Sequence, residues 1–206
     1  MLKTAVAVAA LALAIASAAC AQERLPGVPP AQYDADQKKA AEAFQAERKT
    51  PVFGPFSMLI RNPELMTATR SMGDYLRFKP AIGTTLSEFV ILVTSREWSQ
   101  SYEWNIHAPI ALKQGIDKAV IDAVAAGRRP EHMTDDEAIC YDFTTELHTT
   151  KQVSDATYNR ALKRFGEKGV LDLAAIGGYY TFQAMTMNTA RTTPDGDYRL
   201  PPLPAH

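Results

Sequence analysis

One helix-length segment follows another between residues 62 and 189, and this order leaves little room for a sheet. Asn62 and Pro63 form a strong helix start, because Asn caps helix N-termini and Pro fits the first helical position. Thr134 and Glu137 mark another start, because Thr followed three residues later by Glu has the spacing of a capping box. We therefore expect an all-α fold, a compact bundle of about seven helices.

The expected helices are apolar or amphipathic segments that are separated by turn signals. Their ranges are 34–49, 62–78, 85–98, 99–114, 117–126, 134–148, 154–165 and 168–189. The segment 85–98 contains a continuous apolar run, which periodicity alone would also allow as a strand. The capping-box spacing of Thr85 and Glu88, and the polar end of the segment, favour a helix.

The N-terminus is expected to be a signal peptide rather than part of the fold. Lys3 gives a short positive start, and residues 4–19 are uncharged and rich in Ala. This stretch is too short and too weakly apolar for a membrane span. We expect cleavage before Gln22, with acylation of Cys20 as a lipoprotein as the alternative. Either route exports the protein to the periplasm or beyond the cell.

The rest of the chain divides by composition. Residues 22–32 are rich in Pro and predict an extended linker, and residues 50–57 predict a loop that contains Pro, Gly and aromatic residues. The expected parts are a signal peptide at 1–21, a linker and helix at 22–52, a helical domain at 53–190 and an irregular tail at 191–206.

Charge and cysteine usage exclude several classes of function. The chain of 206 residues has a net charge of -1 and no cluster of Lys or Arg. Nucleic acid is therefore not expected as a partner, since phosphate binding needs clustered positive charge. Signal cleavage leaves Cys140 alone, so no internal disulfide is expected, and a buried apolar role suits this residue. No Gly-rich phosphate loop is present, and we expect no cofactor and no metal.

Glu103 and His107 are the first candidates for chemistry. They lie four residues apart in an expected helix, which places them on one face and one turn apart. A carboxylate beside an imidazole fixes its tautomer and raises its basicity. Such a pair can move a proton to or from a carbon next to a carbonyl. Spacing alone also allows an ordinary ion pair on a surface helix.

Glu88 is a third candidate, and it has two interpretations. It could be the capping partner of Thr85. Alternatively, two antiparallel helices joined by a tight turn could bring it near His107. No metal-binding motif supports a metal site built from Glu88, Glu103 and His107.

Several stretches together carry a resemblance to a known family. They are residues 87–93, 96–98, 102–109, 111–116, 165–166, 169–173 and 178–180. From about residue 53 to residue 188 the chain resembles carboxymuconolactone-decarboxylase-like proteins. The resemblance implies the all-helical alkylhydroperoxidase-D-like fold and assembly into trimers or hexamers. The family contains cofactor-free decarboxylases of carboxylated lactones and thiol-dependent peroxidases.

The match to this family also bears on the site. Its peroxidase branch carries a C-x-x-C that ends four residues before the matching His, and Gln100 and Glu103 stand at those positions here. Thiol peroxidase chemistry is therefore not expected, since no thiolate is present to attack a peroxide. By the same match, Glu88 and His107 occupy the family's proton-relay positions.

The resemblance implies an enzyme, a cofactor-free decarboxylase or related proton-transfer lyase that acts on a small carboxylated or lactone substrate. His107 would be the general acid and base. Glu103 would orient it, and Glu88 would relay the proton or help to bind. The alternatives are a binding protein that kept the fold without the chemistry, and a cysteine-independent peroxide-defence protein. Export departs from the cytoplasmic setting that is usual for aromatic-acid breakdown, so only the class of chemistry is carried over.

Four further residues are candidates for binding the substrate. Tyr102 lies beside the relay positions and could donate a hydrogen bond to a developing enolate. Trp104 is the second aromatic residue of this helix. Arg61 or Arg96 could hold a carboxylate group of the substrate.

Overall fold

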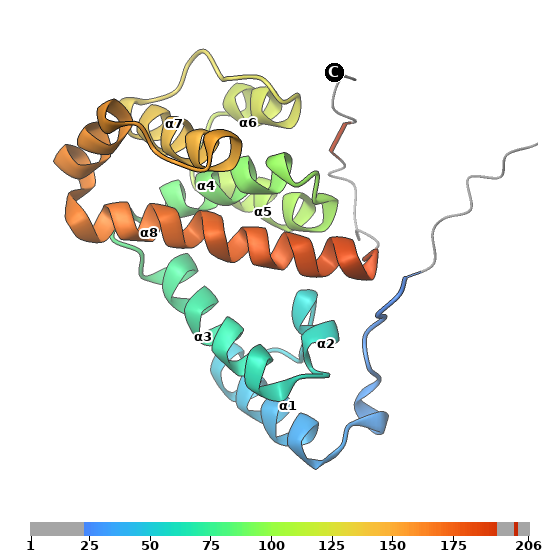
Figure 1. The fold of residues 1–206 in the computed structure, drawn as a ribbon. Coiled ribbons are helices and arrows are strands. Elements are labelled where there is room, and N and C mark those ends of the chain that lie inside the picture. Colours follow the sequence, from blue (N-terminus) through green and yellow to red (C-terminus); the bar gives the residue numbers. More distant parts are fainter. Residues whose placement is uncertain (1–22, 193–199, 202–206) are drawn as a thin grey trace, which may run out of the picture.

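Helices make up most of the part of the chain that the structure describes (Figure 1). The structure, a computed structural model, describes residues 23–192 and 200–201, and within these residues it has eight α-helices and no strand. The all-α prediction is confirmed. The expected signal peptide and most of the expected tail lie outside the described residues. The elements are a 3-10 turn η1 (Pro30–Gln32), α1 (Ala35–Arg48), α2 (Pro55–Leu59), α3 (Pro63–Phe78), α4 (Thr84–Glu97), α5 (Ser101–Lys113), α6 (Lys118–Ala125), α7 (Asp135–Thr150) and α8 (Asp155–Ala190).

Side-chain caps explain where several helices begin. The Asn62 side chain accepts a hydrogen bond from the backbone N–H of Leu65 at 3.0 Å and so caps α3. Thr134 and Glu137 form the expected reciprocal capping box at the start of α7. The two expected helices at 154–165 and 168–189 form one run, α8, with a bend at Gly166. Its φ of 67° is a left-handed conformation that glycine adopts without strain.

Two local predictions are wrong. The expected capping box of Thr85 and Glu88 does not form, because α4 begins one residue earlier and no side chain caps it. Its N-terminal residue is preceded by Gly83, whose φ of 85° suits glycine. Glu88 is thereby left free to point into the protein. The expected loop at 50–57 also ends early, because Pro55 opens the short helix α2.

Helix α4 is the centre of the main core, which explains its continuous apolar run. Helices α5, α7 and α8 all contact it. Phe89, Val90, Ile91 and Leu92 are all fully buried, so the middle of the helix has no face exposed to solvent. Each such side chain contributes about 1.5–3 kcal/mol relative to an exposed position. No helix in the described part of the chain is both long and apolar enough to cross a bilayer.

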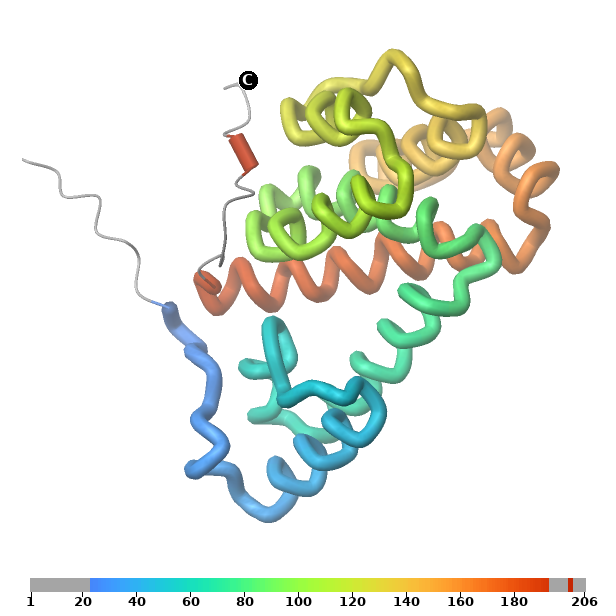
Figure 2. Tube along the Cα trace, turned by 180° about the vertical axis from the view of Figure 1, so that it is seen from behind, coloured from blue at the N-terminus to red at the C-terminus, as the bar shows by residue number. Residues whose placement is uncertain are grey.

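A second, smaller core joins the N-terminal helices to the end of α8. Figures 1 and 2 show α1, α2 and α3 on one side of the long helix α8 and the helices α4 to α7 on the other. Phe44 of α1 is fully buried and its ring lies 5.0 Å from that of Phe56 in α2. Met187 near the end of α8 belongs to the same cluster. This arrangement matters for the site, because α3 contacts α8 and α1 in turn packs on α3.

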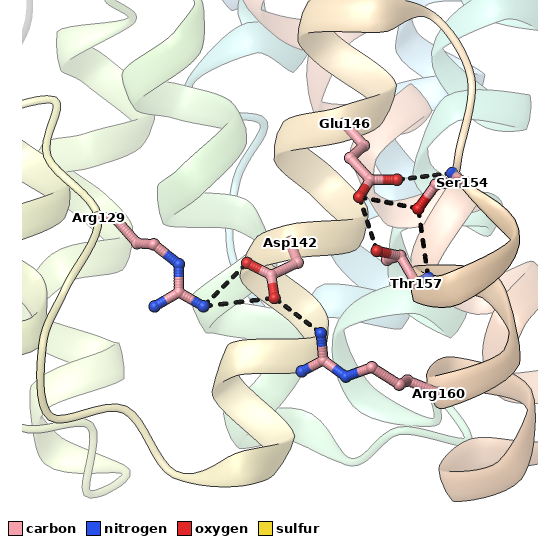
Figure 3. Close-up of polar contacts among 6 residues, drawn as sticks. All are labelled: Arg129, Asp142, Glu146, Ser154, Thr157 and Arg160. Atoms are coloured by element: carbon pink, nitrogen blue, oxygen red, sulfur yellow. Dashed lines mark hydrogen bonds and ion pairs between the residues drawn. The ribbon is translucent and has the colours of Figure 1, made fainter.

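A polar network fixes α7 to the start of α8 (Figure 3). The carboxylate of Asp142 pairs with Arg129 at 3.0 Å and with Arg160 at 2.9 Å. Both arginines are about half exposed, so these pairs contribute little to stability.

The neighbouring carboxylate of Glu146 is expected to contribute more. It accepts hydrogen bonds from the Thr157 hydroxyl and the Ser154 backbone N–H, each at 2.6 Å. These bonds, with that from Thr157 the strongest, lower the pKa of Glu146. We expect Glu146→Ala to lower the free energy of unfolding by roughly 1 kcal/mol at neutral pH, because the first turn of α8 loses its acceptor. Urea denaturation of both proteins measures this.

The pH dependence of that difference provides a check. A depressed folded pKa contributes stability above the pKa of the unfolded chain, and the contribution is lost as the pH falls through the folded pKa. The difference in the free energy of unfolding between wild type and Glu146→Ala should therefore disappear at acid pH. The exposed Glu42 of α1 supplies the control, and Glu42→Ala should change little. A gap that is constant from neutral to acid pH would contradict the assignment.

Candidate active site

Glu88, Glu103 and His107 meet in the interior of the protein. Glu88 comes from α4, and the other two come from α5. The Glu88 Oε2 lies 2.5 Å from His107 Nδ1, and the Glu103 Oε2 lies 3.2 Å from His107 Nε2. All three side chains are buried. The imidazole ring is thus held between two carboxylates, one at each nitrogen.

The turn between α4 and α5 makes this meeting geometrically feasible. The turn is tight, with Ser99 in a left-handed conformation at φ 48°. Gln100 then caps α5 by accepting a hydrogen bond from the Tyr102 backbone N–H at 2.7 Å. Its amide also donates to Asn188 of α8 at 2.8 Å. The residue at the first cysteine position of the peroxidase motif therefore serves here as a helix cap that ties α5 to α8.

The two carboxylates decide the charge of His107. Burial alone lowers the pKa of this imidazole, but Glu88 and Glu103 together outweigh burial, and the net direction is upward. The protonated ring can donate an N–H to each carboxylate, which the neutral ring cannot. A third charge lies behind the pair, since an Arg77 nitrogen is 3.7 Å from the Glu88 Oε1.

Aromatic residues of α8 form one wall of the site. The Tyr180 ring meets the His107 ring edge to face, with centroids 5.2 Å apart. Tyr179 lies next to it, and its hydroxyl accepts a hydrogen bond from Gln183 at 3.3 Å. Burial raises the pKa of both tyrosines, so both hydroxyls stay protonated. A Cβ at Gly73 of α3 would overlap the Tyr179 hydroxyl, and glycine is what lets α3 approach so closely.

A small cavity of about 30 Å³ lies beside the triad. That volume holds a water molecule or two. Glu103 and His107 line it, whereas Glu88 stands behind the imidazole and does not. The other lining residues are Arg48, Phe53, Pro55, Phe56, Arg77, Tyr102, Ile106, Tyr179, Tyr180 and Gln183. Acid–base groups, cations and aromatic rings therefore converge on one small cavity.

Of the residues expected to bind substrate, the structure places Tyr102 at this cavity and the other three elsewhere. Arg61 is exposed and donates to the Pro26 carbonyl at 2.7 Å. Arg96 is buried at the far end of α4 and donates to the Pro201 carbonyl at 2.7 Å. Trp104 follows Glu103, and the helical rotation of about 100° per residue turns it into the main core. The expected carboxylate-binding role of Arg61 or Arg96 is therefore wrong for this cavity.

Sequence reasoning missed the cations that do line the cavity. Arg48 ends α1 and Arg77 lies near the end of α3, so both come from helices other than those of the triad. No local motif marks either residue, because their positions depend on how α3 lies against α8 and α1 against α3. Tyr179 and Tyr180 had a signal, since they fall in one of the stretches that carried the family resemblance.

The one cysteine within the described residues takes no part in the site. Cys140 of α7 is fully buried in the main core and does not line the cavity. Burial, with smaller effects from Asp136 and Glu137, raises the pKa of its thiol. A thiolate is the reactive form of cysteine, so Cys140 is poorly suited to attack a peroxide.

Solved structures with the same arrangement of helices identify the fold. A peroxidase-related protein from Silicibacter sp. TM1040 superposes with a TM-score of 0.68 at 15% identity, over 85% of this chain and 92% of that one. An alkylhydroperoxidase AhpD core protein from Ralstonia eutropha JMP134 gives a TM-score of 0.67 at 18% identity, over 84% and 92%. The chain has the AhpD-like fold. The fold that the family resemblance implied is therefore confirmed.

A third AhpD-like structure, a protein of unknown function from Agrobacterium tumefaciens, gives a TM-score of 0.60 at 11% identity, over 68% of this chain and 96% of that one. No family model matches the sequence, and no curated protein matches it. At these identities the shared AhpD-like fold is all that the solved structures show. The chemistry has to be argued from the site.

Proposed function

We propose that the protein is a thiol-independent proton-transfer enzyme, a cofactor-free decarboxylase or related lyase acting on a small carboxylated or lactone substrate. The observation that carries this proposal is the buried Glu88–His107–Glu103 arrangement beside a small cavity. A buried imidazole whose pKa is shifted by carboxylates next to it is typical of sites of acid–base catalysis.

In this proposal, Glu103 and Glu88 have different roles from those expected from the sequence. His107 and Glu103 face the cavity, so they are the groups that exchange a proton with a substrate. Glu88 lies behind the ring at 2.5 Å and positions the imidazolium. The expected roles of Glu103 and Glu88 are thus exchanged in this proposal.

The reaction step balances without a cofactor. The bond between the substrate and its leaving carboxylate breaks, and the electron pair passes into a conjugated carbonyl to give an enolate. Carbon dioxide leaves, and the His107 imidazolium gives its proton to the enolate carbon. Tyr102, at the cavity wall, is placed to stabilise the enolate oxygen.

The test measures proton transfer on a panel of compounds, so it does not depend on knowing the natural substrate. Small oxo acids and carboxylated lactones are incubated with the protein in D₂O, and carbon dioxide release and deuterium incorporation next to the carbonyl are measured. His107→Gln and Glu103→Gln should each lower the rate by at least about a hundredfold. The exposed His132 provides the control, and His132→Gln should keep the wild-type rate. Wild-type rates in both site variants would refute the proposal.

A peroxide-reducing role is the second candidate, because two of the structures with this fold are described as peroxidase-related. Reduction of a peroxide needs two electrons, and neither a carboxylate nor an imidazole supplies them. Such a role would therefore require a separate reductant. Peroxide consumption in the presence of a thiol reductant that is unchanged in Cys140→Ser, and lost in His107→Gln, would favour this candidate over the first.

We also propose export and self-association. Export is supported by the N-terminal sequence alone, and fractionation of cells tests it.

Self-association is supported by large exposed apolar side chains, among them Leu171 of α8, which is 69% exposed, and Phe78 of α3, which is 57% exposed. Light scattering during size exclusion should give the mass of a trimer or hexamer.

A further inference from the structure

We infer that the cavity takes one carboxylate of the substrate, held by Arg77 and Arg48, and that this ligand arrives through a groove between α1 and α3. The inference rests on the proposed function, because it names the class of substrate for the same site. It also supplies an acceptor for the Nε atoms of both arginines, which have none among the described residues.

The cavity wall contains buried hydrogen-bonding atoms that lack a partner. The Nε atoms of Arg48 and Arg77 are both buried, and neither has a hydrogen-bond acceptor among the described residues. The Arg48 side chain is only 9% exposed. Arg77 has one acidic neighbour, Glu88, and at 3.7 Å the contact is long. Buried donors in native proteins are nearly always satisfied, so these point to an acceptor that the cavity receives.

The charges around the cavity indicate which acceptor fits. With the imidazole protonated, the positive residues are Arg48, Arg70, Arg77 and His107. The negative residues bonded to them are Asp74, Glu88 and Glu103. Arg70 lines the groove and not the cavity, so the extra positive charge lies on the groove side, while Arg48, Arg77 and His107 are balanced by Asp74, Glu88 and Glu103. An acidic group that enters from the groove meets this charge, and a carboxylate matches the planar guanidinium best.

A larger groove on the outside supplies the route. It has a volume of about 630 Å³, and its wall includes Asp74, Arg70 and Lys79 of the α3 region. Arg48 lines both this groove and the inner cavity, so its side chain separates the two. It is held there by Asp74 at 2.7 Å and lies over the Phe56 ring at 5.1 Å. An incoming carboxylate can replace Asp74 as the partner of Arg48 and reach Arg77 behind it.

The position of the arginines also says which part of the ligand they hold. A guanidinium stabilises the charge of a carboxylate, and decarboxylation removes that charge. The carboxylate held by Arg77 is therefore an anchor, and the reacting carbon is another atom of the ligand, next to Glu103 and His107. The remainder of a larger ligand would occupy the groove, since the inner cavity holds little more than the anchor.

Acetate and acetamide test the inference, because they share a shape and differ in charge. Titration of the full protein is followed by the NMR signals of the His107 ring and by calorimetry. Acetate should bind saturably in the millimolar range, and acetamide at least about tenfold more weakly. Arg77→Gln and Arg48→Gln should each weaken acetate binding at least about tenfold. The exposed Arg128 is the control, and Arg128→Gln should bind acetate as the wild type does.

The outcomes separate this inference from the proposed function. Acetate binding that is absent, matched by acetamide, or unchanged in both arginine variants overturns the inference, even if His107→Gln abolishes proton transfer. Arginine-dependent acetate binding that persists in His107→Gln supports it, even if no substrate is turned over. If Arg77→Gln fails to fold, acetate binding is measured instead with Arg48→Gln, at the end of α1, and with Arg77→Lys, which keeps the charge. Chloride that competes with acetate at the same concentration would also overturn the inference, because it would show that the site binds anions without selecting a carboxylate.

Discussion

Glu88→Ala is expected to lower the free energy of unfolding by roughly 3–5 kcal/mol, the usual cost of removing one partner from a buried ion pair. Glu88 is 2% exposed and lies 2.5 Å from His107. Its removal leaves the imidazolium with Glu103 alone and takes the acidic neighbour from Arg77. Urea denaturation at pH 6 measures the effect. Glu97→Ala, at an exposed position of the same helix, should change the value little.

The same variant should change how stability depends on pH. The pKa of folded His107 lies above its ordinary value of 6.5. A raised folded pKa gives a stabilisation that is complete below the unfolded pKa and is lost as the pH rises through the folded pKa. The wild type should therefore lose stability as the pH rises above about 6.5. Glu88→Ala should show a flatter profile, and parallel profiles would argue against the pair as the source of the stabilisation.

Asp172→Ala is expected to cost roughly 3 kcal/mol, because two donors lose their acceptor. Asp172 of α8 is 4% exposed and accepts hydrogen bonds from the Ala81 backbone N–H at 2.5 Å and the Tyr75 hydroxyl at 3.0 Å. The backbone N–H belongs to the turn between α3 and α4, so this carboxylate fixes that turn onto α8. The effect should appear in urea denaturation of the variant.

Two companion variants separate the contributions at Asp172. Asp172→Asn keeps an acceptor oxygen and should recover part of the loss, whereas Tyr75→Phe removes only the hydroxyl donor and should cost about 1 kcal/mol. Glu167→Ala, at an exposed position on α8, is the matched control. A loss below that of Tyr75→Phe in Asp172→Ala would contradict the role of this carboxylate.

The parts of the fold that could be predicted are those that depend on short-range signals. Asn62 and Thr134 mark helix starts, because a side chain three residues or fewer from the first free N–H can cap it. The spacing of Glu103 and His107 places them on one helix face whatever the rest of the chain does. The structure has these predicted local geometries, and it also has the predicted all-α fold.

The parts that could not be predicted depend on contacts between distant segments. A Glu three residues after a Thr suits a capping box, and only the actual start of α4 at Thr84 shows that Glu88 is not used in this way. Arg48 and Arg77 reach the cavity because α3 lies against α8 and α1 against α3, and no spacing rule encodes that. Arg61 and Arg96 were equally good candidates by residue type, which shows that charge without position does not identify a binding residue.

The flanking of His107 at both nitrogens sets the order of events in the proposed enzyme. In its protonated form the ring donates an N–H to each carboxylate and has no lone pair to offer, so this form can give a proton but cannot take one. A catalytic cycle that starts from the protonated ring therefore ends with the uptake of a proton from solvent. The substrate suited to this cycle is one that becomes an enolate when carbon dioxide leaves, because the proton is needed only at that point.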